Sequence, residues 1–239
     1  MKKTDCSIFA IGDLHLPGGD DKSMDVFGEH WEGHFEAIAS DWQQRVAADD
    51  IVLIPGDISW AMKFEEAQPD LLAIAALPGR KILIRGNHDY WWGSISRLRA
   101  WLPPDMQAIQ NDAVMLDGIV FAGTRGWTIP DENATVEDVK IFAREQTRLQ
   151  LSLAHARRIN PDAPLVALIH YPPMQMDGSP SEFTELFTQY GVSDVVYGHL
   201  HGTAAAYAYR GEMGGVRYHP VSCDGLGFTL YQLPDVKGT

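Results

Sequence analysis

The chain has 239 residues, 45% of them hydrophobic and 21% charged, a composition that excludes disordered, collagen-like and coiled-coil proteins. Its 19 basic and 32 acidic residues give a formal net charge of −13, so its field repels phosphate backbones and anionic surfaces, and neither long nucleic acid nor a membrane is an expected partner. Two cysteines are too few for a disulfide scaffold, and no apolar stretch is long enough for a signal peptide or membrane span, so we expect a soluble, cytoplasmic protein.

Short runs rich in β-branched residues alternate with Gly, Pro and Asp turns, and each run predicts a β-strand. In chain order the runs cover residues 7–11, 51–54, 81–84, 113–116, 119–122, 165–169 and 194–197, then 205–210, 216–219 and 227–233. Strands that alternate with helices indicate an α/β fold, and the strand-rich tail favours a second, mixed sheet. We expect a single domain over residues 1–239.

Two helices are predicted between the strands. Pro69 suits the first turn of a helix that ends near Gly79. Thr135 and Asp138 match a capping pattern for the second helix. Its mostly apolar stripe steps by three or four residues through Val139, Phe142, Gln146, Leu149 and Leu153.

Polar side chains follow five of the predicted strands at the point where each strand ends. In chain order they are Asp13 and His15, then Asp57, then Asn87, His88 and Asp89, then His170, and finally His199 and His201. Ligands of open α/β sheets bind beyond the carboxyl ends of the strands. These side chains are therefore expected to gather at one edge.

Apart from His88 and Asp89, the set offers two carboxylates, one amide oxygen and four imidazoles. Such mixed donors suit Mn, Fe, Co, Ni or Zn better than the all-oxygen sites of Ca or Mg. The set is too large for one tetrahedral ion and fits two ions that share a carboxylate. Two such ions clamp the attacking and leaving oxygens of an in-line displacement, which predicts an anionic substrate.

The same residues resemble the motifs of calcineurin-like metallophosphoesterases, namely Asp-x-His, Gly-Asp, Gly-Asn-His-Asp, a lone His and Gly-His-x-His, in order from residue 12 to 201. The resemblance implies a four-layer α/β/β/α sandwich with two mixed sheets. It implies a first metal held by Asp13, His15, Asp57 and His201, with Asp57 as the bridge, and a second completed by Asn87, His170 and His199. It also implies that His88 contacts the phosphate and protonates the leaving oxygen, with Asp89 as its orienting partner.

The residues around the motifs narrow the resemblance. Gly56-Asp57 continues as Ile58-Ser59-Trp60, and the third motif ends in Asp89, whereas protein Ser/Thr phosphatases typically have Val-Asp-Arg-Gly and Glu at these places. His88 stands where the UDP-diacylglucosamine hydrolases of the lipid A pathway typically have Arg. The sequence is then most similar to the bacterial predicted phosphohydrolases, a resemblance that supplies no substrate.

We expect a dinuclear metal-dependent phosphoesterase that hydrolyses a small phosphomonoester or phosphodiester by in-line attack of a metal-bridging hydroxide. A cyclic-nucleotide phosphodiesterase or a nuclease is the alternative among enzymes, and the acidic composition disfavours only long nucleic acid. A non-catalytic metal-binding scaffold of the same fold is the alternative outside the enzymes. Such relatives usually lack ligands, and none is missing here.

Residues beside the motifs suggest further contacts. Segment 17–41 is long for a connection and is interpreted as a lid insertion, with Trp31 or His34 against the substrate. Arg125 and Arg85 are either phosphate clamps or members of surface salt bridges. Four aromatic residues next to the motifs either pack in the core or wall the pocket, and these are Trp60, Tyr90, Trp91 and Trp92.

Overall fold

Two β-sheets organise the computed structural model, which describes residues 6–18, 24 and 28–236. The first sheet has the order β11-β1-β2-β3-β4 and the second the order β5-β6-β7-β8-β10-β9. Both sheets are mixed, because antiparallel pairs of β11 with β1, β5 with β6 and β9 with β10 accompany parallel central strands.

The strands of the first sheet are β1 (Ile8–Ala10), β2 (Ile51–Ile54), β3 (Arg80–Leu83), β4 (Met106–Ala108) and β11 (Tyr231–Gln232). Those of the second are β5 (Ala113–Leu116), β6 (Ile119–Thr124), β7 (Leu165–Ile169), β8 (Asp194–Tyr197), β9 (Gly211–Met213) and β10 (Val216–Pro220). The helices are α1 (His34–Arg45), α2 (Phe64–Ala75), α3 (Ile95–Trp101), α4 (Val136–Ile159) and α5 (Glu182–Gln189), with 3-10 turns η2 (Glu29–Trp31) and η3 (Gly202–Tyr207).

The side chains of each central strand alternate between two buried layers, as the period-2 geometry of a strand requires. Ile51 and Leu53 of β2 face Val166 and Leu168 of β7 in a layer between the sheets. Val52 and Ile54 point the other way, into a layer with α1, α2 and α3. The opposite face of the second sheet packs on α4 and α5.

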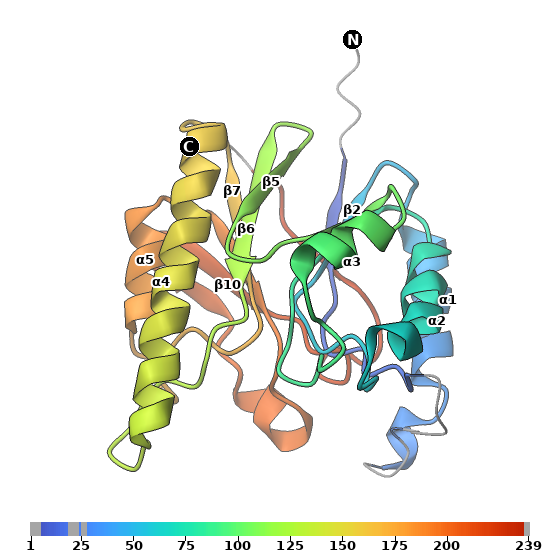
Figure 1. The fold of residues 1–239 in the computed structure, drawn as a ribbon, viewed down its shortest axis with the longest axis horizontal. Helices are drawn as coiled ribbons and strands as arrows, with labels where there is room; N and C mark the ends of the chain where they lie inside the picture. Colours follow the sequence, from blue (N-terminus) through green and yellow to red (C-terminus); the bar gives the residue numbers. More distant parts are fainter. Residues whose placement is uncertain (1–5, 19–23, 25–27, 237–239) are drawn as a thin grey trace.

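Helices therefore cover the outer face of each sheet, and Figure 1 shows α4 and α5 on one side and α1 and α2 on the other. The expected four-layer α/β/β/α sandwich is confirmed. No helix among the described residues has both the length and the apolar character needed to cross a bilayer.

Helix α4 begins at the predicted cap. The Thr135 hydroxyl accepts a hydrogen bond from the Asp138 amide at 3.1 Å, and the Asp138 carboxylate accepts one from the Thr135 amide. Phe142 and Leu149 of the predicted stripe are buried, but Val139 is 49% exposed. Glu145 lies on the buried face instead, with no exposed surface.

The structure corrects the sequence prediction at four places. Helix α2 begins at Phe64 behind a capping box of Lys63 and Glu66, so Pro69 lies inside it rather than in its first turn. No strand forms over 205–210; residues 202–207 form η3 instead, because this run of Gly and Ala offers few β-branched side chains. The strand expected over 227–233 shrinks to β11. Strands β4 and β9 were not predicted, since their sequences are short and lack β-branched residues.

A buried ion pair links β8 to β10. The Asp194 carboxylate accepts hydrogen bonds from Arg217 at 2.8 Å and from His219 at 2.9 Å, and Asp194 has no exposed surface. Burial works to raise the pKa of Asp194, but these two partners hold it below its usual value. The carboxylate is therefore ionised at neutral pH.

Asp194→Asn is expected to lower the free energy of unfolding by about 2–3 kcal/mol, because it leaves the Arg217 guanidinium without its counter-charge and turns an amide NH2 toward either Arg217 or His219 in place of an acceptor oxygen. Arg217 keeps about a third of its side chain in solvent, which limits the loss. Urea unfolding followed by tryptophan fluorescence measures the change. Asp162→Asn, at an exposed loop position, is the control, and equal stability of the two variants would contradict this account.

Candidate metal centre

Seven polar side chains meet at the carboxyl ends of the central strands of both sheets. They are Asp13 and His15 after β1, Asp57 after β2, Asn87 after β3, His170 after β7, and His199 and His201 after β8. Four of them have left-handed backbone, with φ of 58° at Asp13, 46° at His15, 52° at Asp57 and 76° at His199. Such conformations cost about 1–3 kcal/mol each and are typical of functional sites. The backbone is bent here to aim the side chains.

The carboxylate of Asp57 lies at the middle of the seven residues. Its Oδ1 accepts a hydrogen bond from the His88 amide at 2.8 Å, which fixes its rotation. Its Oδ2 lies 3.4 Å from Nε2 of His170 and 3.8 Å from Nε2 of His15. One carboxylate oxygen therefore faces ring nitrogens on two sides.

The first of these sides holds His15, His201 and Asp13. The Nε2 atoms of His15 and His201 lie 3.2 Å apart, and Nε2 of His201 lies 3.7 Å from Oδ1 of Asp13. The Asp13 carboxylate also accepts the amide of His199 at 3.0 Å. This hydrogen bond ties the end of β1 in the first sheet to the end of β8 in the second.

The second side holds Asn87, His170 and His199. Oδ1 of Asn87 lies 2.6 Å from Nε2 of His170 and 3.0 Å from Nδ1 of His199, and those two nitrogens are 3.3 Å apart. Nδ1 of His170 lies 3.0 Å from the carbonyl of Pro55. A proton on that nitrogen donates to the carbonyl and leaves the lone pair of Nε2 facing the other donors.

The spacing of these donor atoms fits metal ions. Metal–ligand distances of about 2.0–2.2 Å place neighbouring donors roughly 3.0–3.5 Å apart around an ion. Most of the donor separations within each side fall in or near this range. Asp13, His15 and His201, and likewise Asp13, Asp57 and His170, can each offer donor atoms that lie within 4.8 Å of one another. The residues present therefore fit two divalent cations.

Burial sets the protonation of the imidazoles. It lowers the pKa of His15 to about 3 and that of His199 to about 4, so both rings are neutral at pH 7 and keep a lone pair for a cation. His201 differs, because the carboxylates of Asp13, at 3.7 Å, and Asp224, at 3.0 Å, overcome its burial and raise its pKa to about 10. Burial and the neighbouring charges of Asp89 and Asp13 raise the pKa of Asp57 well above its usual range.

Asp224 is a site residue that the sequence analysis missed. Its Oδ1 lies 3.0 Å from Nδ1 of His201, and its Oδ2 accepts the amide of Gly202 at 2.8 Å. A carboxylate on the far nitrogen of a histidine fixes the ring and strengthens it as a ligand. Asp224 lies 23 residues beyond His201 in an irregular stretch, so no spacing pattern marks it.

Asp89 does not orient His88, which corrects the prediction. The Asp89 carboxylate is fully buried and accepts four backbone amides and one indole N–H, those of Asp57, Ile58, Ser59, Gly86 and Trp91, at 2.7–3.2 Å. None of these donors is the His88 ring, whose Nδ1 has no partner among the described residues. Asp89 instead fixes the turn that carries Asp57.

Aromatic rings flank the first group of donors. Trp60 stacks on His15 with ring centroids 4.8 Å apart and packs on His88 at 4.4 Å. Trp31 is buried against His15 and His201. Trp91 and Trp92 are buried in the core beneath α3 and do not wall the site.

Trp31 of the segment 17–41 lies beside the donors, but the segment is not one lid, because its second half belongs to α1. Residues 19–23 and 25–27 of this segment lie outside the described residues. His34 is committed to the main chain, with ring nitrogens 2.8 Å from the carbonyl of Leu14 and 3.1 Å from that of Trp31. It holds the aromatic side of the site in place, and a substrate contact stays a prediction for Trp31 alone.

Comparison with known proteins agrees with this geometry. The family model of calcineurin-like phosphoesterases matches residues 6–203. The chain belongs to this family. Two solved structures of the same fold are a protein of unknown function, AQ665, from Aquifex aeolicus and the protein TT1561 of Thermus thermophilus. The Aquifex protein is 15% identical to this phosphoesterase-family chain at a TM-score of 0.52, and the match covers 95% of each chain. The Thermus protein is 18% identical at a TM-score of 0.56, and the match covers 98% of this chain and 100% of the other. No curated protein is significantly similar to the sequence.

Gly198→Ala is expected to abolish tight metal binding by this calcineurin-like protein without unfolding it. A Cβ at position 198 would collide with Oδ2 of Asp13, so that carboxylate must leave its place. Elemental analysis after dialysis against divalent metal measures the loss. Gly93→Ala is the control, because a Cβ there meets nothing within 4 Å. Full metal content in Gly198→Ala would contradict the placement of Asp13.

Asp224→Asn is expected to weaken the affinity for the ion that His201 would bind by about 10–100-fold. The negative charge of Asp224 favours a proton on Nδ1 of His201 and so leaves Nε2 free as a ligand, and a neutral amide lacks that charge. Competition against a metallochromic chelator gives the affinity. Asp235→Asn, at an exposed position outside the motifs, should retain it. Unchanged binding in Asp224→Asn would show that the contact is structural only.

Proposed function

We propose that the chain hydrolyses a small phosphomonoester or phosphodiester with two divalent cations. The observation that carries the proposal is Oδ2 of Asp57, which lies within 4 Å of ring nitrogens of both donor groups. Asp13, His15, Asp57 and His201 would hold one ion, and Asp57, Asn87, His170 and His199 the other. The family supports phosphoester hydrolysis as the chemistry.

Two bound cations would acidify a water and neutralise the charge of the phosphoryl oxygens. The protein supplies the rest by orientation. The turn held by Asp89 keeps Asp57 between the two donor groups, and Asp224 keeps the His201 ring fixed. These contacts preorganise the site before a substrate enters, which is the condition for electrostatic catalysis.

His88 is the proposed proton donor to the leaving oxygen. Its ring packs on Trp60 and lies 5.7 Å, centroid to centroid, from His15, at the boundary between the donor groups and solvent. Its Nδ1 is buried and has no partner among the described residues, so Nε2 is the ring nitrogen proposed to meet the phosphoryl group or the leaving oxygen. Without an aspartate partner, the ring is held by packing alone.

The first test of the function is a metal-supplemented assay with 4-nitrophenyl phosphate and bis(4-nitrophenyl) phosphate. Hydrolysis that needs Mn, Fe, Co, Ni or Zn and stops with chelator supports the proposal. The ratio of the two rates separates a monoesterase from a diesterase. Full activity in chelator, or none with any of these metals, would contradict it.

Asp57→Asn and His88→Gln are expected to fail in different ways. Asp57→Asn should lose metal and activity together, because it removes the shared charge. His88→Gln should keep its metals and lower kcat by roughly 10²–10⁴-fold for alkyl phosphates, with a smaller loss for 4-nitrophenyl phosphate, whose leaving group needs no proton. Elemental analysis and steady-state rates check this. Glu132→Gln, exposed and outside both donor groups, should behave as wild type.

A further inference from the structure

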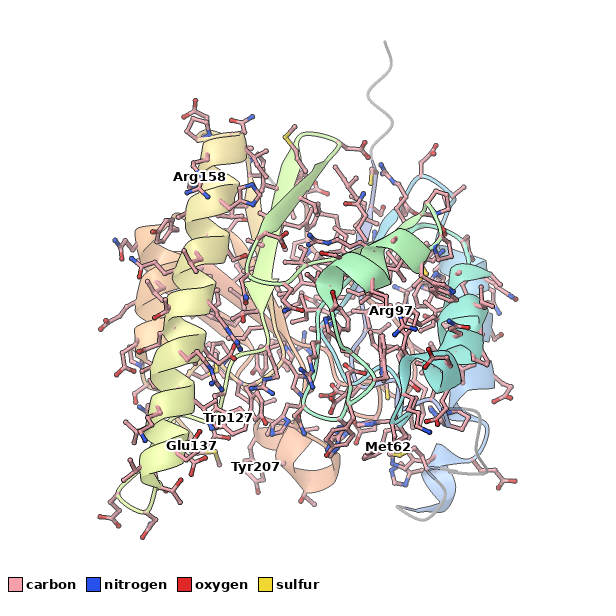
Figure 2. The ribbon with its side chains drawn as sticks, viewed as in Figure 1. Met62, Arg97, Trp127, Glu137, Arg158 and Tyr207 are labelled. Atoms are coloured by element: carbon pink, nitrogen blue, oxygen red, sulfur yellow. The ribbon has the colours of Figure 1, made fainter. Side chains whose placement is uncertain are left out.

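A cavity of about 260 Å³ lies between α4 and the ends of β3 and β6, outside both donor groups. Figure 1 shows α4 alongside β5 and β6, and Figure 2 labels Glu137 and Arg158 near the two ends of that helix. We call it the arginine pocket, since four of its lining residues are Arg85, Arg125, Arg144 and Arg148. Its single acidic lining residue is Glu145.

The charges of the arginine pocket do not balance. Oε1 of Glu145 lies 2.5 Å from Arg148 and 3.6 Å from Arg125, and Oε2 accepts the hydroxyl of Thr124 at 2.8 Å. This fully buried carboxylate pairs with two of the four guanidinium groups, and within the described residues Arg85 and Arg144 form no ion pair. This concentration of positive charge stands in a chain whose formal net charge is −13.

Two of the guanidinium groups are also short of acceptors. The Nε atoms of Arg85 and Arg125 are buried and have no hydrogen-bond partner in the part of the chain that the structure describes. Burial lowers the pKa of Arg125, and the charge of Glu145 only partly offsets it. Buried donors of this kind are expensive to leave without partners. An anion with several oxygens would satisfy both.

The pocket borders the second donor group. Arg85 precedes Asn87 by two residues, which span at most about 7 Å of chain. The carbonyl of Arg125 accepts the amide of His170 at 3.0 Å. The Arg125 guanidinium lies 4.7 Å over the ring of Trp127, which in turn packs against Tyr171, a neighbour of His199.

We propose that the arginine pocket binds a phosphate group or a similar oxyanion, separate from any phosphate at the metal centre. Guanidinium forks match the paired oxygens of such groups, and Arg is favoured where geometry as well as charge is recognised. The anion is either a second charged group of the substrate or a free phosphate ion. The first source rests on the proposed function, whereas binding of the anion itself does not.

Calorimetric titration of the full chain with inorganic phosphate, after chelator treatment, tests binding without help from metal ions. Arg125→Gln and Arg144→Gln are each expected to weaken binding by roughly ten- to hundredfold, the range for a lost charged hydrogen bond. Arg144 is exposed, so its variant decides the matter if Arg125→Gln does not fold. Arg158→Gln, on the same helix but at its far end, is the matched control.

Equal phosphate affinity in wild type, Arg125→Gln and Arg144→Gln would overturn the proposal. The same weakening in Arg158→Gln would also overturn it, because the effect would then reflect net charge alone. Circular dichroism of each variant confirms that the chain is folded. The phosphate titration tests the arginine pocket whether or not the chain hydrolyses phosphoesters.

Kinetics of the metal-loaded enzyme identify the source of the anion. If the substrate supplies the anion, Arg144→Gln lowers kcat/KM for adenosine 3′,5′-bisphosphate about tenfold more than it lowers kcat/KM for adenosine 5′-monophosphate, because one charged contact is lost. The value of kcat/KM for 4-nitrophenyl phosphate is then unchanged. If free phosphate supplies it, both nucleotides are affected alike, and added phosphate changes the rate on 4-nitrophenyl phosphate in wild type more than in the variant. A variant equal to wild type in all these rates would overturn a role for the pocket in the reaction.

Discussion

The carboxylate of Asp57 has a position that no single strand could give it. Its residue leaves β2 in the first sheet, yet Oδ2 faces His170 from the second sheet as well as His15 from its own. The buried carboxylate of Asp89 fixes the turn by accepting the amide of Asp57 and those of its neighbours, and the His88 amide then sets the rotation of the side chain. Asp57 links the two donor groups, and Asp13 also reaches both, with its Oδ1 3.7 Å from Nε2 of His201 and 3.8 Å from Nδ1 of His170. Asp89 therefore belongs to the support of the centre rather than to its chemistry.

The same edge of the sandwich concentrates strain and buried charge. Left-handed backbone at four donor residues and the high density of imidazoles and carboxylates both work against the folded state. Hydrogen bonds across the sheets offset part of this, as where the His199 amide meets the Asp13 carboxylate. Divalent cations would offset more, since they attract the carboxylates and take up the lone pairs of the neutral rings. A centre of this kind gains stability from its ligand, which suits a site built for binding rather than for packing.

The arginine pocket is a second region of concentrated charge beside the donor groups. An acidic protein attracts an anionic ligand only through local positive charge. The structure provides two such places next to each other, one that fits cations and one made of guanidinium groups around Glu145. Both include residues that follow β3, and Arg125 of the pocket accepts the amide of His170 of the second donor group, so an occupant of one lies near the other. Under the proposed function, recognition of a second oxyanion would separate small phosphoesters whose scissile groups are alike.

The sequence by itself determined the α/β class, most of the central strands, the cap of α4 and the seven residues gathered beyond the strand ends. These features are local, because they follow from β-branched runs, turn residues and the rule that ligands lie at the carboxyl edge of a sheet. It did not reveal Asp224, the true contacts of Asp89, or Glu145 as the buried partner of Arg125 and Arg148. Those assignments join residues that are close in space but carry no common spacing, such as His201 with Asp224 and Arg125 with Glu145. Only the packing of one sheet and its helices against the other decides which polar groups face each other, because burial and partnership are properties of the whole fold and not of a segment.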